Sequence, residues 1–207
     1  MKKRKAFTLA EVLITLVIIG VIAALTVPTL IQNTQKREYV SALKKVYSTL
    51  SQVTQQIITE EGSPKSSCET CNDGWAYSAD NIYTLYKKYL SSSKECNFSS
   101  GCWYNAWDNN NELPKLILAD GTLLMFHFLS KDCSKDITGS DDVCAAIWID
   151  VNGNKKPNKF GRDLFNFVIK ESGFYPRGCD SDSCSGSSAD STGGCACKVL
   201  TEGAMNY

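Results

Sequence analysis

The N-terminal segment constrains the fold of this chain more than any other part. Residues 7–31 form a run of 25 residues in which Glu11 is the only charge, and residues 1–6 before it form a short basic segment. A helix rises about 1.5 Å per residue, so this run is long enough to cross a hydrocarbon layer of about 30 Å. The sequence therefore predicts a helix that spans a membrane, with one carboxylate near its start.

The charges around this run predict its orientation. Four cations occupy residues 2–5, and cations in this position are retained on the cytoplasmic side of a membrane. A secretory signal has a shorter apolar core that ends in a small-residue cleavage site, whereas the small residue here, Ala6, precedes the apolar run. We therefore expect a single-pass anchor with a cytoplasmic N-terminus and the rest of the chain on the other side.

Residues 32–62 continue the helix with a different pattern. Their apolar side chains recur at spacings of four and three residues and form one stripe: Tyr39, Leu43, Val46, Leu50, Val53 and Ile57. We predict one helix from about residue 7 to residue 60, ended by Gly62 and Pro64. The alternative is two helices joined near Pro28. In either case, the stripe requires a protein surface to cover it.

Residues 63–207 consist of short segments separated by turns and are expected to form an extracytoplasmic head. Residues 81–90 have the pattern of an amphipathic helix. The predicted strands are two around an Asp120-Gly121 turn in 115–129, then 145–151, 163–169 and, as a candidate, 197–207. The predicted fold class is α+β: a long N-terminal helix, half membrane-spanning and half amphipathic, packed on a small antiparallel sheet.

Ten cysteines follow the apolar run, and none lies in it or before it: Cys68, Cys71, Cys96, Cys102, Cys133, Cys144, Cys179, Cys184, Cys195 and Cys197. An even number on one side of an anchor indicates an oxidising compartment and up to five disulfides. The short separations favour two local pairs, Cys96–Cys102 and Cys133–Cys144. Cys195 and Cys197 are too close to bond easily to each other, so each is expected to reach a more distant partner.

The charge balance limits the classes of partner. The chain has 22 Lys and Arg and 22 Asp and Glu, but without residues 1–6 it has 18 against 22, a net charge of −4. Binding to nucleic-acid phosphates requires an excess of Lys and Arg. We therefore expect no nucleic acid as a partner.

Residues 2–31 resemble the N-terminal signature of type IV prepilins, which is shared by type IV pilins and by type II secretion and competence pseudopilins. The resemblance is carried by the basic segment, the small residue Ala6, and the Phe-Thr-Leu-x-Glu pattern at residues 7–11 that leads into the apolar run. It implies a pilin-like fold, cleavage between Ala6 and Phe7 by a prepilin peptidase, and methylation of the new Phe7 amine. The family usually has glycine before the cut, where this chain has Ala6.

The resemblance also implies a role for Glu11, and the physics of the bilayer supports it independently. An ionised carboxylate deep in lipid costs about 2.5–3.5 kcal/mol, so it is retained only with a partner. Cleavage before Phe7 creates a positive amine, and in a staggered helix bundle this amine can pair with Glu11 of a neighbouring subunit. The alternative is that Glu11 lies at the level of the lipid headgroups or is protonated.

Two further residues of the run bear on the shape of the helix. Gly20 and Pro28 lie where many pilins have a helix-loosening Gly and Pro. Pro28 has no backbone N–H and leaves the carbonyl of Ala24 without its helical partner, so the helix is expected to bend or loosen between Gly20 and Pro28. A tolerated kink without function is the alternative.

Residues 149–165 contain an alternation of oxygen-bearing side chains. The candidate calcium ligands are Asp150, Asn152, Asn154, Asn158 and Asp163. The pattern fails as an EF-hand, because Gly153 is misplaced and Gly161 stands where a bidentate Glu is expected. A rearranged calcium site is one reading, and a tight Asn-Gly turn followed by a loop shaped by Pro and Gly is favoured. We therefore expect no cofactor, with structural calcium as the alternative.

Other candidate chemistry is weaker. Cys68 and Cys71 have the spacing of half a metal site, but disulfide bonding is favoured because no second pair of this spacing is present. His127, the only histidine, lies in a strand-like segment and is expected to be buried or cross-strand. No base for a hydrolase triad is then evident.

The resemblance therefore implies a structural subunit rather than an enzyme, one that polymerises into a type IV pilus or a type II secretion-type pseudopilus. Its expected partners are other pilin or pseudopilin subunits, a prepilin peptidase, an inner-membrane assembly platform and the bacterial cytoplasmic membrane. The alternative is a membrane-anchored extracellular binding module, for calcium, sugar or DNA, that does not polymerise.

Overall fold

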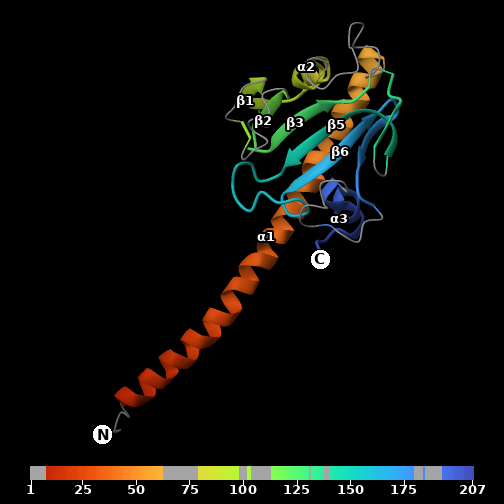
Figure 1. Cartoon of the computed structure of the whole chain (residues 1–207). Helices are drawn as coiled ribbons and strands as arrows, with labels where there is room; N and C mark the ends of the chain where they lie inside the picture. Colours follow the sequence, from red (N-terminus) through yellow and green to blue (C-terminus); the bar gives the residue numbers. More distant parts are fainter. Residues whose placement is uncertain are drawn as a thin grey trace. The chain divides into compact units, whose positions relative to one another are not determined.

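The computed structural model of the chain describes residues 8–62, 79–97, 102–103, 113–130, 132–137, 140–179, 184 and 193–207. The chain divides into two compact units, Met1–Glu38 and Tyr39–Tyr207. The second unit contains the sheet and the short helices (Figure 1). From here on, the head means this unit, which adds residues 39–62 to the expected head of residues 63–207.

Helix α1 (Leu9–Glu61) is one continuous element with Pro28 inside it. The prediction of a single long helix is confirmed, and the alternative of two helices joined near Pro28 is wrong. The helix ends before Gly62, whose φ of 92° lies in the left-handed region that glycine adopts without strain. The N-terminal part of α1 is long and apolar enough to cross a membrane, and none of its most apolar window is buried.

The head half of α1, from Tyr39 onward, buries the predicted stripe. All six of its residues are buried, together with Val40 and Thr54. Helix α2 (Ala79–Tyr89), predicted from residues 81–90, packs in the same core through Ile82, Tyr83 and Tyr86. The apolar stripe of residues 39–57 is therefore covered by protein, as its pattern required.

The head contains a seven-stranded sheet whose strand pairs are all antiparallel. The strands are β1 (Ser92–Asn97), β2 (Lys115–Leu118), β3 (Leu123–Phe128), β4 (Lys135–Ile137), β5 (Ser140–Asp150), β6 (Leu164–Lys170) and β7 (Gly173–Pro176). Their order is β1-β2-β3-β5-β6-β7, and β4 pairs with β5 outside this path. The fold is therefore α+β, disulfide-rich and pilin-like, as predicted.

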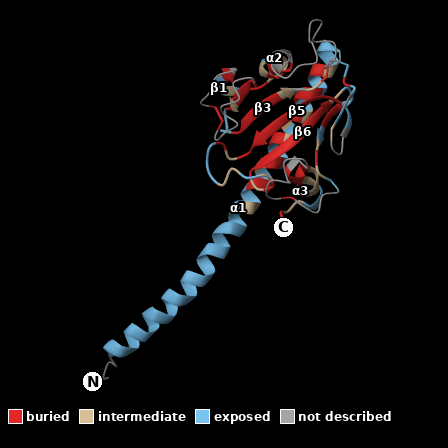
Figure 2. Ribbon diagram, in the orientation of Figure 1, coloured by how far each residue is buried: buried red, intermediate tan, exposed pale blue. Residues whose placement is uncertain are grey.

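The predicted strands form the centre of this sheet. The two strands around the Asp120-Gly121 turn are β2 and β3, and Gly121 has a φ of 90°, which suits glycine at a tight turn. Residues 145–151 and 163–169 correspond to β5 and β6, which pair from Val143↔Lys170 to Asp150↔Leu164. Figure 2 shows that buried residues, in red, gather on these central strands.

The two faces of the sheet bury different side chains, because successive residues of a strand point to opposite faces. On β3, Leu124 and Phe126 pack in the core with α1 and α2, while Leu123 and Met125 pack on the other face. The second face also contains Trp148, Leu164 and Trp103. Burial on both faces explains why these strands read as nearly continuous apolar runs.

The C-terminal prediction is wrong. Residues 197–207 do not add a strand; helix α3 (Ala196–Glu202) follows the short 3₁₀ turn η2 (Gly193–Cys195). Gly203 ends the helix in the left-handed conformation, and its N–H donates to the carbonyl of Val199. A glycine cap of this kind closes a helix, so the apolar pair Val199-Leu200 belongs to a helix face rather than to a strand.

The disulfides agree with the predicted pairs. Cys96–Cys102 and Cys133–Cys144 are both bonded. Cys195 and Cys197 each reach a partner earlier in the chain, in the bonds Cys184–Cys195 and Cys179–Cys197. These last two bonds fix the start of α3. Cys68 and Cys71 lie outside the described residues. His127 lies opposite Ala146 in the β3–β5 pair, as a cross-strand residue, and burial lowers its pKa.

Candidate processing and assembly site

The first turn of α1 holds Glu11 in a reciprocal set of hydrogen bonds with Thr8. The Thr8 backbone N–H and Oγ1 both donate to Glu11 Oε2 at 2.8 Å, and the Glu11 N–H donates to Thr8 Oγ1 at 3.3 Å. This arrangement is a capping box, in which an N-cap hydroxyl and a Glu three residues later satisfy backbone N–H groups at the helix start. Glu11 therefore has a partner within its own chain at the beginning of the apolar run.

Thr8 is a residue that our sequence reasoning missed. The Thr-x-x-Glu spacing at residues 8–11 is itself the signature of a capping box, and it was visible in the sequence. As a lone charge in an apolar run, Glu11 predicts a counter-charge, a position at the lipid headgroups or a protonated carboxyl, and none of these involves Thr8. The structure adds that the same carboxylate defines where the helix begins, immediately after the proposed cleavage position.

Ala6 and Phe7, the residues of the expected cleavage and methylation, lie outside the described residues. Gly20 and Pro28 lie within α1, whose helical assignment is unbroken between them, so the expected loosening stays a prediction. A Cβ placed on Gly20 would meet nothing within 4 Å. Packing within this chain therefore does not require glycine at position 20.

The apolar run is exposed on every side of the helix. The large apolar side chains that are exposed are Leu9, Val12, Leu13, Ile14, Leu16, Val17, Ile18, Ile19, Val21, Ile22, Leu25, Val27, Leu30 and Ile31. A helix that is apolar all round must be covered by lipid or by other helices. The run is therefore a surface that is completed only by an environment outside the chain.

The candidate calcium residues lie around the loop between β5 and β6. The Asp163 carboxylate is buried and accepts backbone N–H groups from Asn158 at 2.8 Å and Lys159 at 2.7 Å. Burial raises the pKa of Asp163, and these hydrogen bonds oppose that shift. At the other end of the loop, Asp150 Oδ1 accepts the backbone N–H of Asn152 at 3.1 Å. The two carboxylates thus stabilise the loop by accepting hydrogen bonds from its backbone N–H groups.

These residues fit a calcium ion only in part. Asn152 Oδ1 and Asn158 Oδ1 are buried oxygens with no hydrogen bond among the described residues, and calcium binds oxygens of this kind. However, both oxygens of Asp163 already accept backbone N–H groups, and Asn154 is exposed. Within the described residues, no group of three His, Cys, Asp or Glu is placed to hold a metal. The hydrogen bonds between the Asp163 carboxylate and backbone N–H groups of the loop therefore occupy oxygens that a calcium ion would need.

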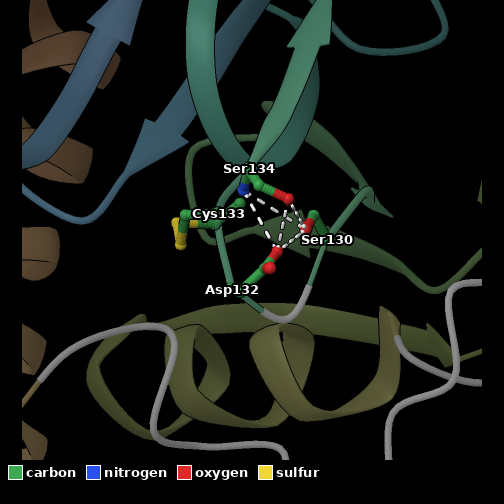
Figure 3. The surroundings of a disulfide bond; sticks show 5 residues. Ser130, Asp132, Cys133 and Ser134 are labelled. Carbon is green, nitrogen blue, oxygen red and sulfur yellow. Dashed lines mark hydrogen bonds between the residues drawn. A yellow bond between two sulfur atoms is a disulfide. The ribbon is translucent and has the colours of Figure 1, made fainter.

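A polar pocket of about 620 Å³ lies elsewhere on the head, beside the Cys133–Cys144 disulfide. Its lining residues are Asp132, Cys133, Ser134, Asp142, Lys170, Glu171 and Ser172. The Asp132 carboxylate accepts hydrogen bonds from the hydroxyls of Ser130 and Ser134 and from the Ser134 N–H (Figure 3). These bonds lower the pKa of Asp132 to about 2. The pocket is acidic because its lining contains three carboxylates, on Asp132, Asp142 and Glu171, and one cation, Lys170.

One comparison with known proteins bears on the N-terminal segment. A family model described as the prokaryotic N-terminal methylation motif matches residues 1–27. Residues 1–27 carry the signature of type IV pilins and pseudopilins. No curated protein and no solved structure matches the chain.

The pilin signature covers Ala6, Phe7, Thr8, Glu11 and Gly20, and it ends one residue before Pro28. It supports a pilin- or pseudopilin-like precursor, and it suggests a structural subunit rather than an enzyme. Together with the exposed apolar helix, it fits a membrane-anchored protein that is exposed at the cell surface. No match covers the head.

Proposed function

We propose that this chain is the precursor of a structural subunit of a type IV pilus or of a type II secretion-type pseudopilus. A prepilin peptidase cleaves it between Ala6 and Phe7 and methylates the Phe7 amine, and the mature subunit polymerises through α1. The observation that carries the proposal is the methylation motif at residues 1–27, joined to a helix whose apolar surface is exposed on all sides.

Glu11 has two roles in this proposal. In the separate chain, its carboxylate is held by the Thr8 hydroxyl and N–H. In the polymer, the positive Phe7 amine of a neighbouring copy neutralises Glu11, and this pairing sets the axial position of one helix against the next. Sister helices then replace lipid around the apolar run. The remaining partners are an inner-membrane assembly platform and the cytoplasmic membrane, with the head outside the cytoplasm.

Processing is tested by intact mass spectrometry of the protein recovered from its native membrane. We expect a mature chain that begins at Phe7, carries one added methyl group, and has lost ten hydrogens to five disulfides. Ala6→Gly, which restores the usual family residue, is the control and should give the same mature mass. Recovery of a chain that still begins with residues 1–6 contradicts the proposal.

Polymerisation is tested by Glu11→Gln. A glutamine oxygen can still accept the Thr8 hydrogen bonds, so the helix start is preserved while the charge is removed. We expect the variant to be anchored and processed but absent from sheared surface filaments, while Thr8→Ser, which retains both hydroxyl and charge, assembles. If Glu11→Gln assembles as wild type does, or if wild-type protein is never found in polymers, the alternative of a non-polymerising binding module replaces this proposal.

A further inference from the structure

The loop between β5 and β6 carries a group of cations. We call residues 154–162 the basic loop; its cations are Lys155, Lys156, Lys159 and Arg162. The three lysines are exposed, and none of their ammonium groups forms an ion pair with a residue that the structure describes. The nearest acids in the sequence, Asp150 and Asp163, are fully buried. The loop therefore presents positive charge outward and keeps its carboxylates inside.

The inner side of the basic loop is fixed to the first residue of the head. Asn152 Nδ2 donates to the Tyr39 hydroxyl at 3.2 Å and to the Lys156 carbonyl at 3.4 Å. On the other flank, Tyr207 donates to the Gly161 carbonyl at 2.7 Å. A Cβ on Gly161 would lie 1.6 Å from the Cys184 carbonyl oxygen, so only glycine allows this close approach. The lysines thus project from a loop whose base is anchored beside Tyr39.

The covalent chain limits how far this loop lies from the membrane. Tyr39 is eight residues after Ile31, the last residue of the apolar run. Eight residues of helix span about 12 Å, and even a fully extended chain spans at most about 29 Å. Lys36, Arg37 and Glu38 lie in the same interval and give it a net charge of +1. A loop anchored at Tyr39 is therefore within reach of the headgroup layer when residues 7–31 span the bilayer.

The opposite end of the head has the opposite charge. Gln55, sixteen residues further along α1 and so about 24 Å from Tyr39, donates to the Ser172 carbonyl at 3.4 Å. Ser172 lines the acidic pocket, in which three acidic residues outnumber one cation: Asp132, Asp142 and Glu171 against Lys170. Residues 39–207 carry 16 Lys and Arg against 20 Asp and Glu, so the basic loop is an exception on an acidic head.

We propose that the basic loop binds anionic phospholipid headgroups while the subunit waits in the membrane. Lys155, Lys156 and Lys159 supply the contact, the Asn152–Tyr39 bond holds the loop at the headgroup level, and the acidic pocket keeps the far end of the head away from the lipid surface. The attraction between the lysines and the anionic headgroups amounts to about fivefold in lipid occupancy for each lysine at the surface. Salt screens this attraction at separations beyond the Debye length, which is about 10 Å at 0.1 M salt. The inference rests on the membrane anchoring in the proposed function.

The test is lysine acetylation of the full chain in lipid nanodiscs, read by peptide mass spectrometry. One set of discs contains phosphatidylcholine only, and the other contains phosphatidylcholine with phosphatidylglycerol. We expect acetylation of Lys155, Lys156 and Lys159 to slow by about fivefold in the anionic discs and to recover at high salt. Lys170, at the acidic end of the head, is the internal control and should react equally in both.

Equal acetylation of the three lysines in both kinds of disc overturns the inference. Protection that depends on several copies per disc, and not on phosphatidylglycerol, also overturns it and assigns the loop to a contact between copies. Failure of the chain to enter discs at all contradicts the proposed anchoring instead. As a control on charge, Lys155→Gln with Lys156→Gln should weaken the lipid-dependent protection of Lys159, because two of the three charges at the surface are removed, whereas Lys170→Gln should not change it.

Discussion

The two halves of α1 are one helix, but they differ in what covers their apolar side chains. From Leu9 to Ile31, apolar residues surround the helix and are exposed. From Tyr39 to Ile57, they form one stripe that is buried against the sheet and α2, and the remaining faces are polar. The first half depends on an outside environment, and the second is completed within the chain. This difference separates assembly from folding: changes in the first half should affect polymers, and changes in the second should affect the stability of the head.

The largest expected effect comes from truncating a leucine in each half. Leu50 is fully buried in the head core, whereas the Leu16 side chain is 60% exposed. Leu50→Ala should lower the free energy of unfolding of the head by about 2–5 kcal/mol, because it removes buried methyl groups and leaves a cavity. Leu16→Ala should leave that free energy unchanged. Denaturant unfolding of the full chain in detergent, followed by tryptophan fluorescence, measures both; equal losses would abolish the distinction between the halves.

A matched pair of threonines sharpens the comparison. Thr26 and Thr54 both donate to the carbonyl four residues earlier, at 2.9 Å and 2.7 Å. Only Thr54 also shares a hydrogen bond with the buried hydroxyl of Tyr86. Thr54→Val should cost about 1–3 kcal/mol of head stability, because it leaves the Tyr86 hydroxyl buried without its partner.

Two controls are available: Thr26 in the same helix, and Tyr86, the hydrogen-bond partner of Thr54. Thr26→Val should not change head unfolding. Adding Tyr86→Phe to Thr54→Val should recover most of the loss, because neither polar group then remains unsatisfied. No recovery in the double variant would show that the cost arises from packing and not from the Tyr86 hydroxyl.

Sequence patterns predicted the parts of the fold in which one side of an element is consistently apolar. The stripe of α1, the strands around Asp120-Gly121 and the central strands β5 and β6 follow from such patterns. The strands β1, β4 and β7 were not predicted. β1, with the sequence SSKECN, has no apolar face, β4 has only three residues, and β7, with the sequence GFYP, contains Gly and Pro, which are depleted in strands. The type of the C-terminal element depends on the Gly203 cap and on two disulfides with partners outside it.

The candidate site shows the same division. Glu11 was predictable because a lone carboxylate in an apolar run is rare, and Thr8 was detectable from its spacing to Glu11. The partners of Asp163 were not predictable, because they are backbone N–H groups that only the folded loop brings to it. Equally, no pattern in the sequence places Asn152 against Tyr39, which is 113 residues away.

The smallest expected effect concerns the loop that Tyr39, the first residue of the head half, contacts through Asn152. If calcium organised this loop, the stability of the head would depend on the metal. The Asp163 carboxylate instead has both oxygens on backbone N–H groups, so we expect chelation or added calcium to change the free energy of unfolding by less than about 0.5 kcal/mol. Asp163→Asn, in the absence of metal, should lower it by about 1–3 kcal/mol, because the amide accepts through one oxygen only. A clear rise in melting temperature with calcium that is lost in Asn158→Ala would contradict this expectation. It would place the ion on the buried oxygens of Asn152 and Asn158. The start of the head half would then depend on a bound group, as the membrane half depends on lipid.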